Sequence, residues 1–455
     1  MTNRVTQLNA QTIRRLRVRI QRKVSRIHKD NRRTLIALQF FSSVLEYFDF
    51  FAFAYLSMYF IKFFPHDLLE IYGMALLSLV SFLFRPVGYR LYLYLIQRIS
   101  PLKLYTINSI LISLAILSTG LMPFGDGDMG LMIVLIFIGR AVYGICFGIR
   151  LQGNLQFVKR HYPARIHNAL LSTLIGAQVG LSCASFVNKM IYNHLSSSDM
   201  DWGWRIPFFI GALFSFVLFV VRMIIHKPEQ QKIPVRAMLP QSIDQVAFQA
   251  GRQLWLSLLL SSARACLMFN LFISVPLMLN WVLKWSYGSI TNIMFVAALL
   301  NSGASWYIRL RKVKSQGNHI LITLILSLLF SAIIGWAIVY HDYLWIVSCI
   351  FILAIINGYL FFNIPKFINN LFEVRYRQEA MLFIGNFEFF HFNLLRRCLL
   401  VVSLIYFGSV ITQHCFLAIM IVTMEITFLA GILALISIRR GNFPKKECGN
   451  MTSMA

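Results

Sequence analysis

Long apolar runs recur along the whole of this 455-residue chain, and they restrict the folds open to it. Many approach the ~20 residues that a helix needs to cross a bilayer. Hydrophobic residues make up 58% of the chain and charged residues only 13%, too few for the surface of a soluble domain of this size. We therefore expect an all-α, polytopic membrane protein with about twelve transmembrane helices. The predicted spans are residues 34–62, 68–96, 102–122, 130–158, 165–192, 204–226, 253–283, 288–309, 319–340, 343–370, 378–406 and 412–438.

The chain has a formal net charge of +26, and its basic and acidic residues are predicted to lie on opposite sides of the membrane. Alternate connections are basic, and the others carry acidic residues such as Asp67, Asp126 and Asp201. This positive-inside pattern predicts cytoplasmic termini and therefore an even number of spans. Topology explains most of the excess charge, so no nucleic-acid partner is expected. The basic connections contain Arg98, Lys103, Lys159, Arg160, Arg165, Arg311, Lys312, Lys314, Arg375 and Arg377.

Three polar segments divide the chain into predicted units. Residues 1–33 are strongly basic and predict either an amphipathic helix on anionic cytoplasmic lipids or a disordered tail that sets topology. Residues 227–252 contain three prolines and separate six spans from six, and residues 439–455 form a second cytoplasmic tail. We predict two six-helix bundles, residues 34–226 and 253–438, joined by a cytoplasmic loop.

Four motifs in the first half resemble those of the metabolite:proton symporter family, a branch of the major facilitator superfamily. The first span contains LEYFDF, similar to LEWYDF in that family, and FRPVG at 84–88 is similar to its RPxG. WGWRIPFFIGAL at 202–213 matches the start of its sixth helix, and IGRAVYGICFGI resembles its fourth. The resemblance implies the major facilitator fold, a secondary transporter, and a central cavity lined by the first, fourth, seventh and tenth helices.

The chain departs from that family where gating contacts are expected. The stretch YLIQRISPLKLY replaces the loop GDRxGRK after the second helix: Gln97 stands at the acidic position, and Arg98 remains. Arg150 occupies a position in the fourth helix that is acidic in the family. The substrate of a relative therefore cannot simply be transferred. These changes also motivate an alternative function, a degenerate carrier fold that acts as a non-transporting sensor or as a component of a membrane protein complex.

Carboxylates inside apolar spans are costly and point to function. Glu46 and Asp49 share one face of the first span at i, i+3 spacing. Two buried carboxylates this close do not easily stay ionised together, so we predict proton coupling there, with ion pairing to a neighbouring arginine as the alternative. Glu388 and His391 have the same spacing in the eleventh span. They are a predicted second proton relay, or else a buried polar pair.

Arginines inside the spans supply the counter-charge, because guanidinium binds carboxylate or phosphate through two parallel hydrogen bonds. The resemblance implies that Glu46, Asp49, Arg140 and Arg264 converge on the cavity. Arg140 is alternatively the structural partner of one of the two carboxylates. For Tyr47, the aromatic candidate, packing or interfacial anchoring is the commoner role. The predicted substrate-binding residues are Arg85, Arg140, Arg264 and Tyr47.

Three further arginines, Arg98, Arg150 and Arg205, are candidate gating residues. For Arg150, as for Arg90, we expect the guanidinium to snorkel to the cytoplasmic interface. Arg205 lies in the WGWRIPF motif and is expected to orient or close the outer end.

Motifs of soluble enzymes and ATPases are absent: the chain has no GxxxxGK[ST], HExxH or GxSxG. The seven cysteines are scattered without CxxC spacing. We therefore expect no enzyme, no cofactor and no metal site. The predicted function is proton-coupled secondary active transport of a small anionic or zwitterionic metabolite by alternating access. The predicted location is the bacterial inner membrane, where metabolite, protons and lipid bilayer are the partners.

Overall fold

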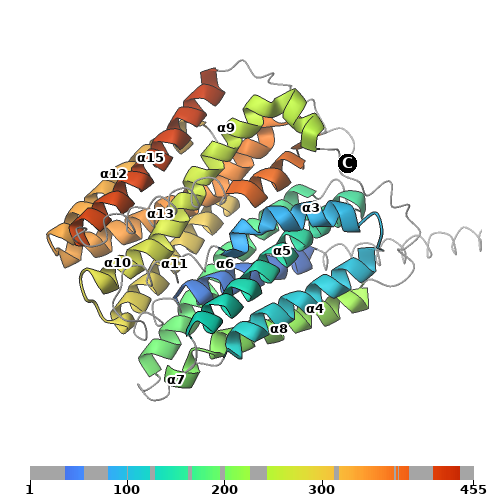
Figure 1. Cartoon of the computed structure of the whole chain (residues 1–455). Coiled ribbons are helices and arrows are strands. Elements are labelled where there is room, and N and C mark those ends of the chain that lie inside the picture. Colours follow the sequence, from blue (N-terminus) through green and yellow to red (C-terminus); the bar gives the residue numbers. More distant parts are fainter. Residues whose placement is uncertain are drawn as a thin grey trace, which may run out of the picture.

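The structure is a computed structural model, and its described residues are almost entirely helical, with no strand among them (Figure 1). Each of the twelve predicted spans contains a described helix. The basic residues 1–33, the loop residues 227–242 and the tail residues 441–455 lie outside the described part. The described residues are 36–55, 80–99, 101–122, 129–161, 166–194, 200–225, 243–311, 317–373, 376–377, 379–388 and 413–440.

Eight helical stretches in the described part are long and apolar enough to cross a membrane, so the chain is a multi-pass membrane protein. The helices of the first half are Ile36–Tyr55, α3 (Arg85–Leu95), α4 (Pro101–Gly120), α5 (Met129–His161), α6 (Ile166–His194), α7 (Met200–Gly203) and α8 (Ile206–Ile225). The helices of the second half are α9 (Ile243–Phe269), η4 (Asn270–Ser274), α10 (Val275–Trp281), α11 (Tyr287–Leu310), α12 (Gly317–Val339), α13 (Tyr343–Leu371), residues 379–388 and α15 (Gln413–Arg440).

The helices pack in two groups that meet along a seam. In the first half, α4 packs against α5 and α8, and α3 packs against α5. In the second half, α13 packs against α9, α11 and α12, while α15 packs against α9 and α12. An extensive contact between the two halves joins α6 to α11, and Figure 1 shows these two helices in the middle of the molecule.

Glycines allow the helices of the first half to approach closely. A Cβ atom on Gly148 of α5 would lie 2.3 Å from the backbone oxygen of Arg85, at the start of α3. A Cβ atom on Gly180 of α6 would lie 2.4 Å from the backbone oxygen of Val44. Small residues at such crossings are how membrane helices gain close packing. Both glycines allow a backbone approach that a side chain would block.

The helical segment from Ile243 to Trp281 departs from regular α-helix at two places. Ala250 has non-helical backbone angles (φ −133°, ψ 27°), so residues 243–249 form a helical turn inside the segment predicted as loop. Further on, α9 passes into the π-helix η4 and then into α10. π-helical turns are frequent at functional sites. Pro365 does not end α13, because the helix continues past it to Leu371.

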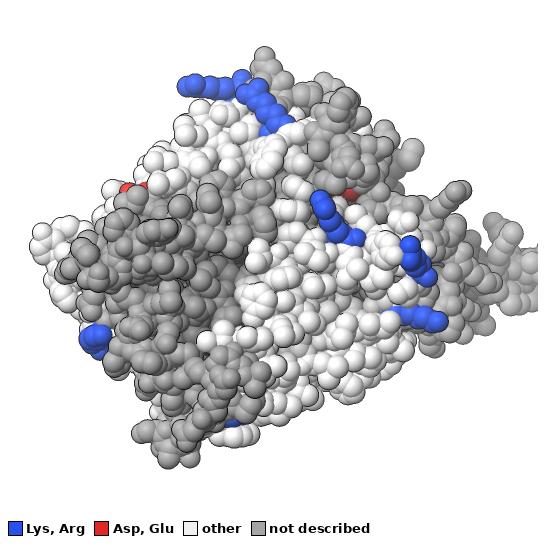
Figure 2. All heavy atoms as spheres, viewed as in Figure 1, with Lys and Arg blue, Asp and Glu red and all other residues white. Residues whose placement is uncertain are grey.

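The outer surface is suited to a lipid environment. Large exposed apolar side chains line the outward faces of several helices, among them Leu213 of α8, Leu299 of α11 and Leu329 of α12. Figure 2 shows few charged atoms on the visible described surface.

Candidate functional site: a charged cavity between the two halves

A cavity of about 960 Å³, with its open mouth included, lies where the two halves meet. The first half contributes residues of Ile36–Tyr55, α3, α5 and α6, and the second half contributes residues of α9, α13 and 379–388. The charged side chains on its wall are Glu46, Arg85, Arg264, Lys366 and Glu388.

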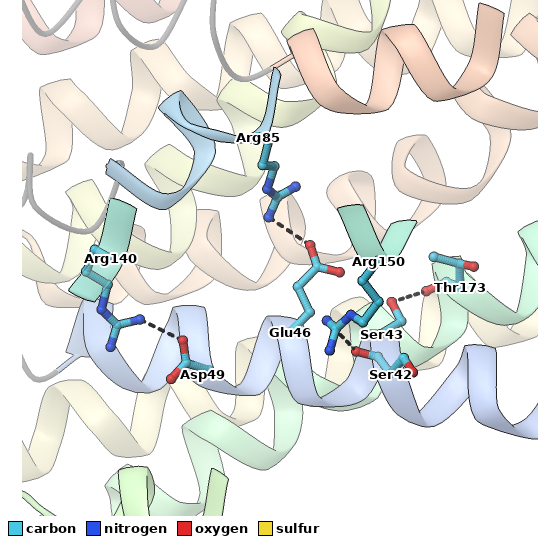
Figure 3. A network of polar contacts seen from close by, with 8 residues as sticks. All are labelled: Ser42, Ser43, Glu46, Asp49, Arg85, Arg140, Arg150 and Thr173. Atoms are coloured by element: carbon cyan, nitrogen blue, oxygen red, sulfur yellow. Dashed lines mark hydrogen bonds and ion pairs between the residues drawn. The ribbon is translucent and has the colours of Figure 1, made fainter. Parts of the chain in front are cut away.

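The first ion pair on the cavity wall joins Glu46 to Arg85. An Nη atom of Arg85 donates to Glu46 Oε1 at 2.7 Å, and both side chains are buried (Figure 3). The Cζ atom of Arg85 lies 3.7 Å from the ring centroid of Phe82 and 4.2 Å from that of Phe147. The two rings hold the guanidinium by cation–π contact and leave its hydrogen-bonding edge for a carboxylate.

The second ion pair on the cavity wall belongs to the other half. Arg264 of α9 donates to Glu388 at 2.5 Å, and the hydroxyl of Ser261 donates to the same carboxylate oxygen. Ser262 donates to the backbone oxygen of Glu388 at 2.9 Å. The Cζ atom of Arg264 lies 4.5 Å from the ring centroid of Phe361. Each half therefore contributes one arginine–carboxylate pair to the same cavity.

A third ion pair is buried away from the cavity. Arg140 donates to Asp49 at 2.6 Å, and neither residue belongs to the cavity lining (Figure 3). The Cζ atom of Arg140 lies 3.9 Å from the ring centroid of Phe53. Asp49 and Arg140 therefore do not line this cavity as expected, and the ion pair expected as the alternative for Arg140 is present. The physical reason is that α3 and α5 present their arginines to different turns of the first helix.

The position of Arg150 also differs from the one expected from the sequence. It was expected to snorkel to the interface, but it is buried and donates to the backbone oxygen of Ser42 at 3.1 Å (Figure 3). Its Cζ atom lies 5.0 Å from the ring centroid of Phe147. Arg90, by contrast, is exposed. The difference arises because α5 packs against neighbouring helices at Arg150, where a carbonyl group is within reach.

Aromatic residues of the two halves meet at the cavity wall and further along the first helix. Tyr47, the predicted stacking residue, lines the cavity, and its ring lies 6.2 Å from that of Phe361 of α13. One turn further along the first helix, Phe51 meets Phe272 of the π-helix η4 at 6.0 Å. Phe50 likewise lies 6.4 Å from Phe269 at the end of α9. These contacts join the two halves.

The remaining predicted gating residues lie away from the cavity. Arg98 is exposed, and its Cζ atom lies 4.2 Å from the ring centroid of Tyr94. Arg205 donates to the backbone oxygen of Met122 at 3.0 Å, which ties the start of α8 to the end of α4. His391 lies outside the described residues, so the predicted Glu388–His391 relay stays a prediction. Within the described part, no group of three or more His, Cys, Asp or Glu residues is arranged to hold a metal ion.

A row of polar side chains runs along the seam between α6 and α11, and the sequence reasoning missed it. Asn301 donates to the side-chain oxygen of Gln178, and Asn357 of α13 donates to Asn301 at 2.9 Å. One turn further along, the hydroxyls of Ser182 and Ser302 lie 2.8 Å apart. Amides within apolar spans were the available signal, because they need partners in a membrane. A lone amide in a sequence does not show which helix supplies its partner.

Comparison with known proteins places this geometry in a family. The family model of the Major Facilitator Superfamily matches residues 40–390. A putative proline/betaine transporter of Staphylococcus haemolyticus is 29% identical over 195 residues, 41% of each chain. A citrate-proton symporter of Salmonella typhi is 30% identical over 197 residues, 41% of this chain and 44% of the relative. These similarities span less than half the length of each curated relative.

Solved structures show the same fold over almost the whole chain. A D-xylose-proton symporter superposes with a TM-score of 0.69, covering 90% of this chain and 97% of that one at 13% identity. A POT family transporter in complex with a thioalcohol-conjugated peptide gives a TM-score of 0.62, covering 89% of this chain and 96% of that one at 11% identity. At these identities the likeness concerns the fold alone.

Proposed function

The chain belongs to the Major Facilitator Superfamily, and from that premise we propose that it is a secondary active transporter of a small anionic or zwitterionic metabolite. The observation that carries the proposal is the cavity between the halves, where Glu46–Arg85 faces from one half and Glu388–Arg264 from the other. Ionisable side chains are retained inside a membrane protein chiefly where they bind or move a substrate or ion.

The chemistry of the cavity supports this substrate class. Each guanidinium can exchange its internal carboxylate for a carboxylate of the substrate, with two parallel hydrogen bonds. A released Glu46 or Glu388 would accept hydrogen bonds from a cationic group of a zwitterion. Because the two pairs belong to different halves, a substrate that contacts both would link the movement of one half to that of the other.

Proton coupling is proposed for the carboxylates of the first helix. Protonation of Asp49 would weaken its ion pair with Arg140, and protonation of Glu46 would release Arg85 toward the cavity. Protonation of Asp49 would take place in the packed interior, whereas protonation of Glu46 would take place on the cavity wall. We therefore propose that Asp49 carries the coupling proton and that Glu46 contributes mainly to the binding site.

The arrangement of the cavity supports a cytoplasm-facing state. Its lining residues on α6 and α13, such as Leu174 and Ile368, lie in the helix halves that the positive-inside pattern assigns to the cytoplasm. The opposite halves of α6 and α11 are joined by the hydrogen bond that Asn193 donates to Asn292 at 3.0 Å and by the stacked rings of Tyr192 and Tyr287, and the first helix meets η4 through Phe51–Phe272. We propose rocking of the two halves about this cavity in a bacterial inner membrane, with both termini cytoplasmic.

Uptake into proteoliposomes tests the proposal. The purified full chain would be reconstituted and offered labelled carboxylates, amino acids and betaines, with and without an imposed pH gradient. We expect saturable uptake of at least one compound, and greater accumulation when the gradient is present. Absence of uptake across the panel, together with stable co-purification of membrane protein partners, would instead support the non-transporting sensor or complex component.

A further inference from the structure

Two guanidinium groups share one aromatic ring beside a single carboxylate. The Cζ atoms of Arg85 and Arg150 lie 4.2 Å and 5.0 Å from the ring centroid of Phe147. Arg85 forms the ion pair with Glu46, while Arg150 donates to the carbonyl of Ser42, one helical turn before Glu46. Figure 3 shows Arg150 beside this turn of the first helix.

The charges around Glu46 do not balance. Glu46 interacts electrostatically with both Arg85 and Arg150. Two further carboxylates are within electrostatic reach, Glu388 of Glu46 and Asp49 of Arg150. Each has its own hydrogen-bonded arginine, Arg264 and Arg140. With the carboxylates ionised, the group Glu46, Arg85 and Arg150 carries one more positive than negative charge. A buried surplus charge is unfavourable until an opposite charge joins it.

The position of the surplus charge relative to the cavity decides its effect. Glu46, Arg85 and Phe147 line the cavity, whereas Arg150 lies behind them and is buried. If Arg85 turns its edge toward an entering carboxylate, Arg150 remains as the counter-charge of Glu46. An anion then balances the group. A zwitterion brings its own positive charge and leaves the group unbalanced.

We propose that Arg150 is a specificity-determining residue, which makes this cavity select net-anionic substrates over zwitterions of the same shape. This inference rests on the proposed function of the cavity and narrows its substrate class to carboxylates without a compensating cation. Arg150 acts through Glu46 and Arg85 and is a positioning residue, because it does not itself line the cavity.

The test uses pairs of compounds that differ only in charge. Cyclopentanecarboxylate has nearly the shape of proline without its ammonium group, and 3,3-dimethylbutanoate has that of glycine betaine without its quaternary nitrogen. Thermal unfolding of the purified full chain would be followed while each compound is titrated, because a ligand of the folded state raises the unfolding temperature. We expect the anions to stabilise wild-type protein at concentrations about tenfold lower than their zwitterionic partners.

Variants then assign the preference to Arg150. In Arg150→Gln the ratio within each pair should fall to about one, whereas Arg150→Lys, which keeps the charge, should retain most of it. Arg90→Gln is the matched control, because it removes the same charge from an exposed position on α3. An unchanged ratio in Arg150→Gln overturns the inference. So does a preference of wild-type protein for the zwitterions, or no stabilisation by any of the four compounds.

The measurement on wild-type protein keeps the inference testable even if Arg150→Gln does not fold. It also separates this inference from the proposed function. If proteoliposomes take up a labelled zwitterion as well as its anionic partner, transport stands and the role of Arg150 fails. If wild-type protein binds anions selectively but transports none of them, the proposed function fails while the binding preference stands.

Discussion

Glu46 and Asp49 lie three residues apart on one helix, yet each forms its ion pair with an arginine of a different helix. Arg85 comes from α3 and Arg140 from α5. Glu46 lines the cavity, whereas Asp49 is packed away from it. We therefore propose separate tasks for the two carboxylates in the transport cycle, and substitutions should distinguish them.

Replacement of Asp49 tests the coupling role. In Asp49→Asn, we expect pH-driven accumulation to fall about tenfold or more, while exchange of labelled for unlabelled substrate continues, because exchange needs no net proton movement. Uptake and counterflow in the same proteoliposomes would show this. Loss of both activities in a folded protein, or retention of full accumulation, would contradict the assignment.

The same substitution has a predictable effect on stability. Removal of the Asp49 charge leaves Arg140 buried without its partner, which costs about 3–5 kcal/mol in folding free energy. The double variant Asp49→Asn/Arg140→Gln should recover a large part of this loss, because it removes the stranded charge as well. Thermal unfolding in detergent of the two single variants and the double variant measures the coupling between the two residues.

Arg264 is expected to act on substrate affinity. In Arg264→Lys, the positive charge remains but the planar pair of donors is lost, so KM should rise about 10–100-fold with a smaller change in maximal rate. Concentration-dependent uptake gives both values. The matched control is Arg90→Lys, at an exposed position outside the cavity lining. A similar rise in KM in both variants would argue against a binding role for Arg264.

We expect the seam between α6 and α11 to open during transport. Ser182 and Ser302 face each other across it with their hydroxyls 2.8 Å apart, so cysteines at both positions are well placed for a disulfide. Oxidation of Ser182→Cys/Ser302→Cys should stop transport, and a reductant should restore it. The neighbouring exposed Cys183 would first be replaced by serine. Each single-cysteine variant, treated with the same oxidant, is the control. Continued transport by a fully cross-linked protein would contradict the rocking movement.

Gly148 should tolerate no side chain. A Cβ atom there would lie 2.3 Å from the backbone oxygen of Arg85, so Gly148→Ala must push α3 away from α5 at a cost of about 1–3 kcal/mol. Gly303 of α11 is the matched control, because a Cβ atom there meets nothing within 4 Å. Gly303→Ala should be neutral or more stable by up to ~1 kcal/mol, since alanine favours helix. Thermal unfolding compares the two variants. Equal stability would show that α3 and α5 can move apart freely.

The amide network shows where prediction from sequence stops. Gln178, Asn301 and Asn357 were visible as polar residues within apolar spans, but nothing in their spacing paired them. Arg150 is a second case. Its place near a predicted helix end suggested snorkelling, and only the packing of α5 shows that it is enclosed beside the carbonyl of Ser42. Burial depends on neighbouring helices, which a single helix does not specify.

The sequence by itself determined the membrane-spanning class, the approximate positions of the helices, and the location of the costly charges on them. Helix length, hydropathy and the charge of the connections are local properties, and a bilayer acts on them directly. Only the tertiary structure decided the partners of those charges. Glu46–Arg85, Asp49–Arg140 and Arg264–Glu388 join residues separated by 39, 91 and 124 positions. Pairing over such distances depends on which helices cross and at which turn. That choice placed Glu46 on the cavity wall and Asp49 behind it.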